Sequence, residues 1–487
     1  TLDDTVYVMY TSGSTGVPKG VAISHIGLMD YCSFASRSYY QGSAQSKLKR
    51  DGSLVVTAHC FDITVPSLYV PLIMGDSVRF LQAGEELSDL AAQLHATGCP
   101  NYLLRMTPMH VRALLDTMDS RSPEAQAAGA ERQAQHVFVI GGEAFTATLA
   151  KQLQQHFPRS QVYNHYGPTE TVVGCAMFDV TAHGDLLEQV LPIGRPMDNT
   201  RLYVLHADLT PCPVGVVGQL HIGGLGVAKG YLNQAQLSAE KFIADPFVAG
   251  ERLYRSGDTA RFLASGDIEY LGRMDDQVKL RGYRIELGEI RAQLMLHEQV
   301  KEALVLVKGE GEADGENKRL VAYLVPHTFD ADKESTLIDA ARAHLRAVLP
   351  DYMQPAAYSV LAAFPLTANG KIDQRSLLAS GDVYLPQQSM VAPANPTEEK
   401  LVALWQKILG LESVSCTANF FEIGGHSLLA MRLINAVQTE FEIAFSLKAL
   451  MEHQTIQLMA SKILATLALQ SNIAGAENND NSIEMEW

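Results

Sequence analysis

The sequence predicts a multidomain protein with an α/β region, a small α+β region and an all-α bundle. Its 487 residues are too many for one hydrophobic core. Strand-like apolar runs alternate with helical stretches until about residue 270, and helical periodicity takes over beyond the Pro-rich stretch 385–396. The expected parts are 1–275, 276–380, a linker at 381–396, a four-helix bundle at 397–468 and an acidic tail at 469–487.

The first region opens on an apolar run, "VYVMY", followed by "YTSGSTGVPKG" at Tyr10–Gly20. The run predicts a buried strand. The glycines and hydroxyl groups of the loop could gather donors around an anion, and Lys19 could neutralise a phosphate. The P-loop pattern does not fit, because Pro18 stands in place of its second glycine. From these residues alone, the stretch could be a phosphate loop or a plain turn.

Two further runs, 136–145 and 161–170, predict buried strands that end in Gly-containing loops, where an α/β fold binds ligands. The second region contains charged turns and a predicted helix from Thr336 to Leu349. In the third region, Thr397 is the expected N-cap of a helix that Gly410 ends. The sequence from Ser427 onward repeats the helical spacing.

Composition narrows the class of protein. Hydrophobic residues make up 47% and charged residues 19%, which is typical of a globular protein. No apolar stretch is long enough for a membrane span, and no secretory signal is visible. The net charge of −16 disfavours nucleic acid as a partner. Six cysteines without C-x-x-C pairs argue against zinc and disulfides, so a cytoplasmic location is expected.

Motifs spread along the chain resemble those of the adenylation domain of a non-ribosomal peptide synthetase, a member of the AMP-binding, acyl-adenylate-forming superfamily, followed by its peptidyl carrier domain. They occur in the family's order: "YTSGSTGVPKG", "FDIT", "NHYGPTE", "GQLHIGGLGVAKGYL", "YRSGD", "GRMDDQVKLRGYRIELGEI", "LPDYMQP", "NGKID" and "FFEIGGHSLLA". The resemblance begins at the phosphate loop. It therefore implies a large adenylate-forming domain that lacks its N-terminal part, and it assigns the opening loop to the ATP phosphates.

The resemblance assigns nucleotide contacts to several of these motifs. Tyr166 would stack on adenine, Asn164 and the Gly141–Gly142 turn would line the base, and Asp258 would accept the ribose hydroxyls with Arg273 nearby. The implied nucleotide-binding residues are Thr11, Ser12, Gly13, Ser14, Thr15, Gly16, Gly141, Gly142, Asn164, Tyr166, Gly167, Thr169, Asp258 and Arg273.

The family joins a carboxylate to the α-phosphate of ATP, so catalysis depends on positioning two anions and neutralising their charge. The resemblance implies Lys371 as the catalytic lysine between the two groups. It implies Glu170 as the ligand of Mg²⁺, a cation that prefers carboxylate oxygen. Thr11 and Lys19 complete the implied catalytic set.

The resemblance also implies a second half-reaction. Asp275 matches the family's hinge, about which the small domain would rotate to exchange Lys371 for the loop Lys279–Gly282. Ser427 in "GGHSLLA" would carry covalent 4′-phosphopantetheine, on which the activated amino acid is loaded as a thioester. The implied partners are an amino acid substrate, a phosphopantetheinyl transferase and upstream and downstream synthetase modules.

The specificity pocket implied by the resemblance contains two cationic or potentially cationic side chains, Arg105 and His165. Asp62 would hold the substrate's α-ammonium, and a guanidinium in a dry pocket calls for a carboxylate. The expected substrate is therefore aspartate or β-hydroxy-aspartate, before glutamate. The pocket residues are Asp62, Ile63, Pro66, Arg105, Val139, Gly141, His165, Val173, Gly174 and Lys371.

Two other functions stay open at this point. An acyl-CoA synthetase or luciferase-like ligase shares the nucleotide motifs, but it needs neither a carrier domain nor Asp62. A non-catalytic carrier and docking fragment is the alternative of a different class, because a truncated large domain could fail to act alone.

Overall fold

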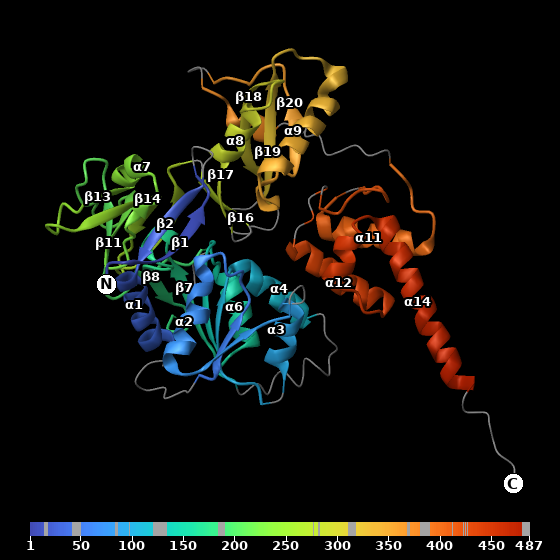
Figure 1. The fold of residues 1–487 in the computed structure, drawn as a ribbon, viewed down its shortest axis with the longest axis horizontal. Coiled ribbons are helices and arrows are strands. Elements are labelled where there is room, and N and C mark those ends of the chain that lie inside the picture. Colours follow the sequence, from blue (N-terminus) through green and yellow to red (C-terminus); the bar gives the residue numbers. More distant parts are fainter. Residues whose placement is uncertain are drawn as a thin grey trace, which may run out of the picture.

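The computed structural model describes residues 1–13, 18–40, 50–82, 86–96, 98–119, 134–183, 190–275, 277–280, 283–309, 318–367, 371–379, 390–411, 413–421, 423, 425 and 427–479. Figure 1 shows three regions: a large α/β region, a small region above it and a helical region beside it. The multidomain fold class expected from the sequence is confirmed. The domain boundaries set at residues 275, 380, 396 and 468 stay predictions.

The described part of the large region is built on a seven-stranded sheet. Five strands run parallel in the order β4-β3-β5-β6-β7, and β8 and β9 continue the sheet antiparallel. The strands are β3 (Gly52–Val55), β4 (Ser77–Phe80), β5 (Tyr102–Met106), β6 (Val137–Gly141), β7 (Gln161–Tyr166), β8 (Ala176–Asp179) and β9 (Arg195–Pro196).

Both faces of this sheet are buried, because alternate residues of each strand point to opposite sides. Leu104 and Phe138 pack with the helices of one face, whereas Leu103 and Val137 belong to the cluster on the other. The helices of the region are α1 (His25–Ala35), the π-helical turn η1 (Ser36–Tyr40), the 3₁₀ turn η2 (Asp62–Thr64), α2 (Val65–Met74), α3 (Glu86–His95), α4 (Pro108–Asp119), α6 (Ala147–His156) and η3 (Thr169–Thr171).

Two smaller sheets complete the large region. Strands β1 (Thr5–Thr11), β2 (Lys19–Ser24) and β12 (Gly230–Tyr231) form one of them. The other contains β10 (Thr200–Leu205), β11 (Gly218–Gly224), β13 (Phe242–Ala244), β14 (Arg252–Phe262) and β15 (Ile268–Arg273), with helix α7 (Ala235–Lys241) beside them. The prediction that "VYVMY" is buried is wrong. Tyr10 is 62% exposed, and among the described strands β1 lies at the edge of its sheet and pairs with β2.

The small region begins with a hairpin, β16 (Gln277–Leu280) and β17 (Tyr283–Glu286), that reaches back to the large region (Figure 1). A three-stranded sheet follows, and helices α8 and α9 pack on it. Its elements are α8 (Leu287–Met295), β18 (Val300–Lys308), β19 (Arg319–Pro326), η5 (Ala331–Lys333), α9 (Glu334–Val348), η6 (Asp351–Met353), β20 (Ala357–Val360) and α10 (Gln374–Ala379). The helix expected from Thr336 to Leu349 is therefore confirmed as α9.

The helical region contains α11 (Pro396–Leu409), α12 (Ser427–Phe441), α13 (Leu447–Glu452) and α14 (Ile456–Asn479). Gly410 ends α11 in the left-handed conformation, as expected. The expected N-cap is wrong. Asn395 takes this place, and its Oδ1 accepts from the Glu398 amide at 2.9 Å. Pro396 then occupies the first helical turn, where its missing N–H costs nothing.

Helix α14 continues to Asn479, beyond residue 468, where the bundle was expected to end; the rest of the acidic tail lies outside the described residues. Helix α12 lies against α4 of the large region (Figure 1), and buried apolar side chains of the two regions form one continuous cluster. None of the helices in the described ranges is long and apolar enough to cross a membrane.

Candidate active site

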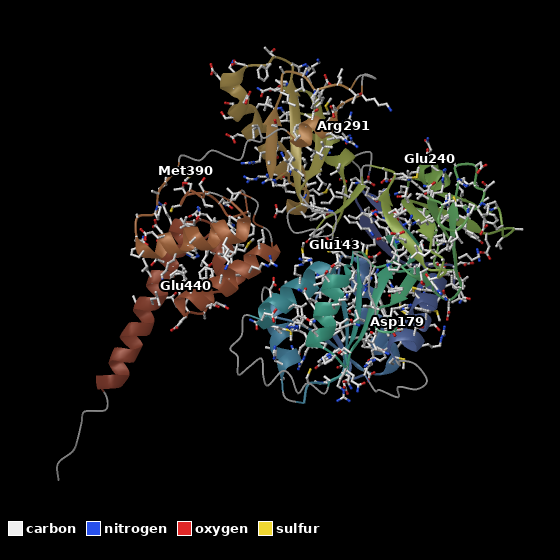
Figure 2. All side chains as sticks on the ribbon, turned by 180° about the vertical axis from the view of Figure 1, so that it is seen from behind. Glu143, Asp179, Glu240, Arg291, Met390 and Glu440 are labelled. Atoms are coloured by element: carbon white, nitrogen blue, oxygen red, sulfur yellow. The ribbon has the colours of Figure 1, made fainter. Side chains whose placement is uncertain are left out.

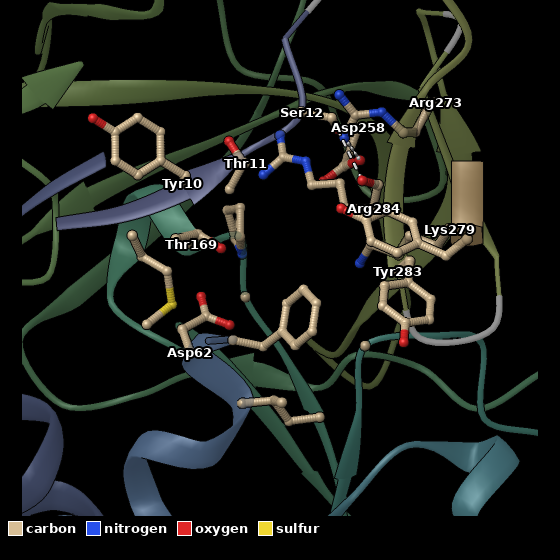
Figure 3. A pocket seen from close by; sticks show the side chains of 17 residues that line it. Tyr10, Thr11, Ser12, Asp62, Thr169, Asp258, Arg273, Lys279, Tyr283 and Arg284 are labelled. Atoms are coloured by element: carbon tan, nitrogen blue, oxygen red, sulfur yellow. Dashed lines mark hydrogen bonds and ion pairs between the residues drawn. The ribbon is translucent and has the colours of Figure 1, made fainter. Parts of the chain in front are cut away.

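The main pocket lies where the strands of the large sheet end and the small region begins. Figure 3 shows its wall, to which Thr11, Asp62 and Thr169 contribute from the large region and Arg284 from the small one. The pocket is lined by Met9, Tyr10, Thr11, Ser12, Phe61, Asp62, Ile63, Gly142, Gly167, Pro168, Thr169, Asp258, Arg273, Lys279, Tyr283, Arg284 and Tyr352. This is the position at which open α/β sheets bind ligands.

The loop after β1 meets the small region directly. The Ser12 hydroxyl donates to the Arg284 carbonyl at 2.8 Å, and the Gly13 amide donates to Glu289 Oε2 at 3.1 Å. Lys19 Nζ lies 3.1 Å from Glu286 Oε1, and both side chains are buried. Carboxylates of the small region therefore bind the Lys19 ammonium and the Gly13 amide, which were expected to bind phosphate. Ser14, Thr15 and Gly16 lie outside the described residues.

Glu170 is completely buried and pairs with Arg284 from β17 at 2.7 Å. The Tyr231 hydroxyl donates to its other oxygen at 2.8 Å. Burial would raise the pKa of Glu170, but the charges of Arg284 and Lys19 outweigh this effect and lower it to about 2. Glu170 is consequently a carboxylate at any working pH, and oxygen of this kind suits a hard cation.

The side of the pocket where the ribose is expected carries a second ion pair. Asp258 Oδ1 lies 2.7 Å from Arg273 Nη1, and its other oxygen accepts from the Tyr166 hydroxyl. Lys279 Nζ lies over the rings of Tyr166 and Tyr270, at 5.3 and 5.9 Å from their centroids. Burial lowers the pKa of the Lys279 ammonium.

A smaller pocket adjoins this side and shares Gly142 and Lys279 with the main one. Asn164, Tyr166 and Glu143 contribute to its lining, and Figure 2 shows Glu143 on the face of the large region that is turned toward the small region. The Asn164 amide donates to the Pro192 carbonyl at 2.8 Å. The residues expected around the base are therefore gathered in one place.

Asp62 lies in the 3₁₀ turn η2, directly before helix α2. Burial raises the pKa of its carboxyl group, and the Thr169 side chain, followed by the charge of Arg105, opposes this shift less strongly. Among the described residues, Asp62 Oδ2 and the Thr11 hydroxyl are buried without a hydrogen-bond partner. Because Asp62 and Thr11 both line the pocket, these atoms are available to a ligand. Ile63 lines the pocket beside Asp62, and Pro66 is buried in the first turn of α2.

Arg105 and His165 lie side by side at the ends of β5 and β7. Arg105 Nη2 is 2.8 Å from His165 Nδ1, and Arg105 Nη1 donates to the Val139 carbonyl at 2.9 Å. Burial, followed by the charge of Arg105, lowers the pKa of His165 well below its ordinary value. His165 is therefore a neutral acceptor here, and of these two side chains Arg105 carries the positive charge.

Two glycines leave room for this pair. A Cβ at Gly141 would lie 2.9 Å from Arg105 Nη1, and one at Gly174 would lie 1.9 Å from His165 Cε1. Val173, before Gly174, has a φ of 63°, a left-handed conformation that is unfavourable for a β-branched residue. Of the residues expected in a specificity pocket, Asp62 and Ile63 line the main pocket and His165 lines the smaller one, so the pocket as a whole stays a prediction.

The chain matches three family models in order. They are an AMP-binding enzyme at residues 1–232, an AMP-binding enzyme C-terminal domain at 289–371 and a phosphopantetheine attachment site at 399–463. It is 39% identical to tyrocidine synthase 3 of Brevibacillus parabrevis over 94% of this chain, and 39% identical to bacitracin synthase 3 of Bacillus licheniformis over 93%. It spans 7% of the length of each relative.

The chain consists of adenylation and carrier domains of the non-ribosomal peptide synthetase family.

Solved structures agree with this family. The fold of holo-PA1221, an NRPS protein containing adenylation and PCP domains, matches with a TM-score of 0.73 at 24% identity, over 96% of this chain and 73% of that chain. The adenylation domain AlmE of Vibrio cholerae matches with a TM-score of 0.63 at 25% identity, over 78% of this chain and 66% of that chain.

The structure does not bring Lys371, the expected catalytic lysine, to the adenylation pocket. Lys371 is exposed and does not line the main pocket. The hairpin β16–β17 of the small domain contributes to the pocket lining instead. Lys279, expected to approach for the second half-reaction, does line the pocket; Gly282 lies outside the described residues. The catalytic role expected of Lys371 stays a prediction.

Two further residues were expected to have a role: Asp275 as the hinge and Ser427 as the modification site. Asp275, just after β15, accepts from Arg273 Nε and Nη2 at 2.6 and 2.7 Å. Ser427 is the first residue of α12 in the carrier domain, and its side chain lies outside the description. Sequence reasoning missed Arg284, although it stands in the quoted motif "RGYRIELGEI", and it missed Tyr31, Tyr231 and Tyr352.

Proposed function

We propose that the protein carrying this chain activates an amino acid with ATP and then loads it onto its own carrier domain. In the first step a substrate carboxylate oxygen bonds to the α-phosphorus of ATP, and the bond to the leaving pyrophosphate breaks. In the second step a thiol attacks the carbonyl carbon, and AMP leaves. The observation that carries this proposal is the convergence of Asp62, Thr11, Asp258 and Arg273 on one pocket.

Each of these groups has a chemical part. Asp62, whose Oδ2 has no partner among the described residues, would hold the α-ammonium. Asp258, fixed by Arg273, would accept the ribose hydroxyls. Lys371 would neutralise charge between the carboxylate and the α-phosphate once the small domain rotates. This electrostatic positioning accounts for most of the catalysis in such a site.

Mg²⁺ fits Glu170 by chemistry, since Glu170 is a buried, ionised carboxylate. In the present domain orientation Arg284 neutralises it, so the ion would bind after Arg284 withdraws. When bound, Mg²⁺ would neutralise phosphate charge. 4′-Phosphopantetheine, attached at Ser427, would supply the accepting thiol, in keeping with the attachment-site match at 399–463.

The proposed substrate is aspartate or β-hydroxy-aspartate, before glutamate. Arg105 is only 3% exposed and lies next to Gly141, whose neighbour Gly142 lines the pocket. Its hydrogen bonds to the Val139 carbonyl and to His165 are with neutral acceptors. A substrate carboxylate would add charge-assisted hydrogen bonds to the guanidinium.

The test is amino-acid-dependent ATP–pyrophosphate exchange in the full-length protein with each of the twenty amino acids. We expect aspartate to give the highest rate. Arg105→Met should lower kcat/KM for aspartate about 10²–10³-fold, since a buried unpaired carboxylate costs about 3–5 kcal/mol. Preference for an apolar or basic amino acid would overturn the assignment.

The same measurement separates the alternatives. The carrier match opposes a free acyl-CoA ligase, which would form no thioester on Ser427. If the full-length protein catalyses exchange and this chain alone does not, the isolated chain acts only as a carrier and docking fragment. Exchange by neither protein would contradict the proposed activity.

A further inference from the structure

Tyr31, a residue of helix α1, contacts the specificity pocket through His165. Its hydroxyl oxygen lies 3.3 Å from His165 Nε2, and the two rings meet edge to face with centroids 6.0 Å apart. Tyr31 is 4% exposed and His165 is 2% exposed. No sequence motif of the family pointed to this residue.

Arg105 and Tyr31 lie on opposite sides of the His165 ring, and their contacts show which ring nitrogen carries the proton. Arg105 Nη2 is always a donor, so His165 Nδ1 must accept at their distance of 2.8 Å. The remaining proton of the neutral ring then sits on Nε2, and the Tyr31 oxygen accepts it. In the other tautomer, an N–H of His165 would face an N–H of Arg105 and that hydrogen bond would be lost, whereas the Tyr31 hydroxyl would donate to Nε2 instead of accepting from it.

Packing confines the ring of His165. A Cβ at Gly174 would lie 1.9 Å from His165 Cε1 and 2.1 Å from Nε2, so this edge of the ring lies close to that backbone. The edge-to-face contact with Tyr31 would survive loss of the hydroxyl group. The buried Nε2–H group, in contrast, would lose its acceptor, and the alignment of Nδ1 with Arg105 would weaken.

We propose that Tyr31 is a positioning residue for amino-acid specificity, which accepts from His165 Nε2–H and so holds the ring where its Nδ1 accepts from Arg105, with Arg105 facing the substrate side chain. This inference rests on the proposed function of the pocket. Tyr31 would not touch the substrate. It acts through His165, which fixes one edge of the guanidinium while the Val139 carbonyl fixes another.

The experiment compares Tyr31→Phe with the wild type in the full-length protein by ATP–pyrophosphate exchange. We expect KM for aspartate to rise about tenfold, which equals about 1.4 kcal/mol, and the preference for aspartate over asparagine to fall by a similar factor. KM for ATP and kcat should change less than about twofold, because the nucleotide contacts do not involve Tyr31.

Tyr40→Phe is the matched control. Tyr40 is equally buried, lies in the turn that continues α1, and gives its hydroxyl hydrogen to Asp76 at 2.7 Å. This variant also loses one buried hydroxyl group, so it should alter thermal stability without altering the ratio of aspartate to asparagine. A fall of that ratio in Tyr40→Phe as large as in Tyr31→Phe would overturn the inference.

The outcomes separate this inference from the substrate proposal. If the wild type prefers aspartate and Tyr31→Phe keeps the ratio, the inference is wrong and the proposal stands. If the wild type prefers another amino acid, the aspartate proposal is wrong. The inference is then decided by the ratio between that amino acid and its nearest isostere, which must fall in Tyr31→Phe.

A second variant decides the matter should Tyr31→Phe fold poorly. The residue 3-fluorotyrosine, placed site-specifically at position 31, weakens the hydroxyl oxygen as an acceptor with little change in shape. We expect a smaller fall of the same ratio, about two- to threefold, corresponding to a part of one hydrogen bond. An unchanged ratio would overturn the inference.

Discussion

Asp62 must be ionised to hold an α-ammonium, and its surroundings make this pH-dependent. Burial raises the pKa of Asp62 above its ordinary value of 3.8. As the pH falls through this raised pKa, the carboxylate gains a proton and loses its attraction for the substrate. We expect kcat/KM for the amino acid in pyrophosphate exchange to fall about tenfold per pH unit below that point.

Asp62→Asn provides the control for this acid limb. The variant should lose most of its activity, and its remaining acid limb should move to lower pH, where only the substrate's own carboxyl groups titrate. Circular dichroism at each pH separates titration from unfolding. An acid limb that is the same in wild type and variant would contradict the assignment of the limb to Asp62.

At the level of single residues, the sequence predicted the charged side chains of the site better than the side chains that they contact. Asp62 and Asp258 belong to motifs with a fixed order, and both line the pocket. Arg105 stands outside these motifs and lies beside His165. The contact of Tyr31 with His165 depends on how α1 packs across β7, which is a tertiary property that no local pattern encodes. The neutral state of His165 likewise follows from its burial beside Arg105.

The hairpin β16–β17 and the helix after it contact the groups that are expected to bind ATP phosphates, so in the observed orientation they would compete with ATP. Glu286 pairs with Lys19 and Glu289 accepts from the Gly13 amide, both of which are expected to bind phosphate. Replacing both carboxylates, Glu286→Gln with Glu289→Gln, should therefore favour ATP. We expect KM for ATP in exchange to fall about three- to tenfold, and single-turnover loading of the carrier to slow.

Glu302→Gln is the control for this double variant, since Glu302 is a half-exposed glutamate of the same domain that pairs with Lys301. It should change neither quantity. Equal KM for ATP in the double variant and the wild type would contradict the competition.

If Asp275 is the hinge, as we expect, the two half-reactions use different faces of the small domain. Lys371→Ala should abolish adenylate formation, measured by pyrophosphate exchange, and spare thioester formation from supplied aminoacyl-AMP. Arg284→Met should instead slow thioester formation more than tenfold, because it leaves Glu170 buried without its ion pair. Loss of both steps together in Lys371→Ala would contradict this division.

Sequence periodicity identified most helices and strands, but not all of their ends or their positions in a sheet. Helix α9 and the Gly410 stop were predicted, since both follow from local spacing and backbone conformation. The N-cap of α11 was misplaced because Asn395 and Thr397 are both good caps, and Pro396 between them decides in favour of Asn395. The exposed face of β1 was missed because its place at the edge of a sheet depends on tertiary pairing.

The arrangement of whole domains includes a charged contact between the carrier and the adenylation domain. Arg432 of α12 lies 2.7 Å by its Nε and 2.5 Å by its Nη2 from Asp116 of α4. Both side chains are partly exposed, so the pair contributes only about 0–1 kcal/mol. Arg432→Asp should slow single-turnover loading about three- to tenfold, and adding Asp116→Arg should restore it.

Pyrophosphate exchange in the same variants is the control, because adenylate formation does not involve the carrier. It should stay unchanged in all of them. Failure of the double variant to recover loading would show that the pair does not guide docking. The motifs could not predict this contact or the position of Lys371, since domain orientations differ by small energies that the order of motifs does not encode.

The packing of α12 on α4 has a consequence for competition between carriers. A carrier joined to its own adenylation domain by a short linker meets α4 at an effective concentration on the order of millimolar. The interface can therefore be weak, and the carrier can leave quickly after loading, while a carrier from another chain would need about millimolar abundance to displace it. Specificity for the attached carrier then comes from the covalent connection rather than from affinity. A foreign carrier joined in its place should therefore be loaded, provided that it keeps a residue that can pair with Asp116.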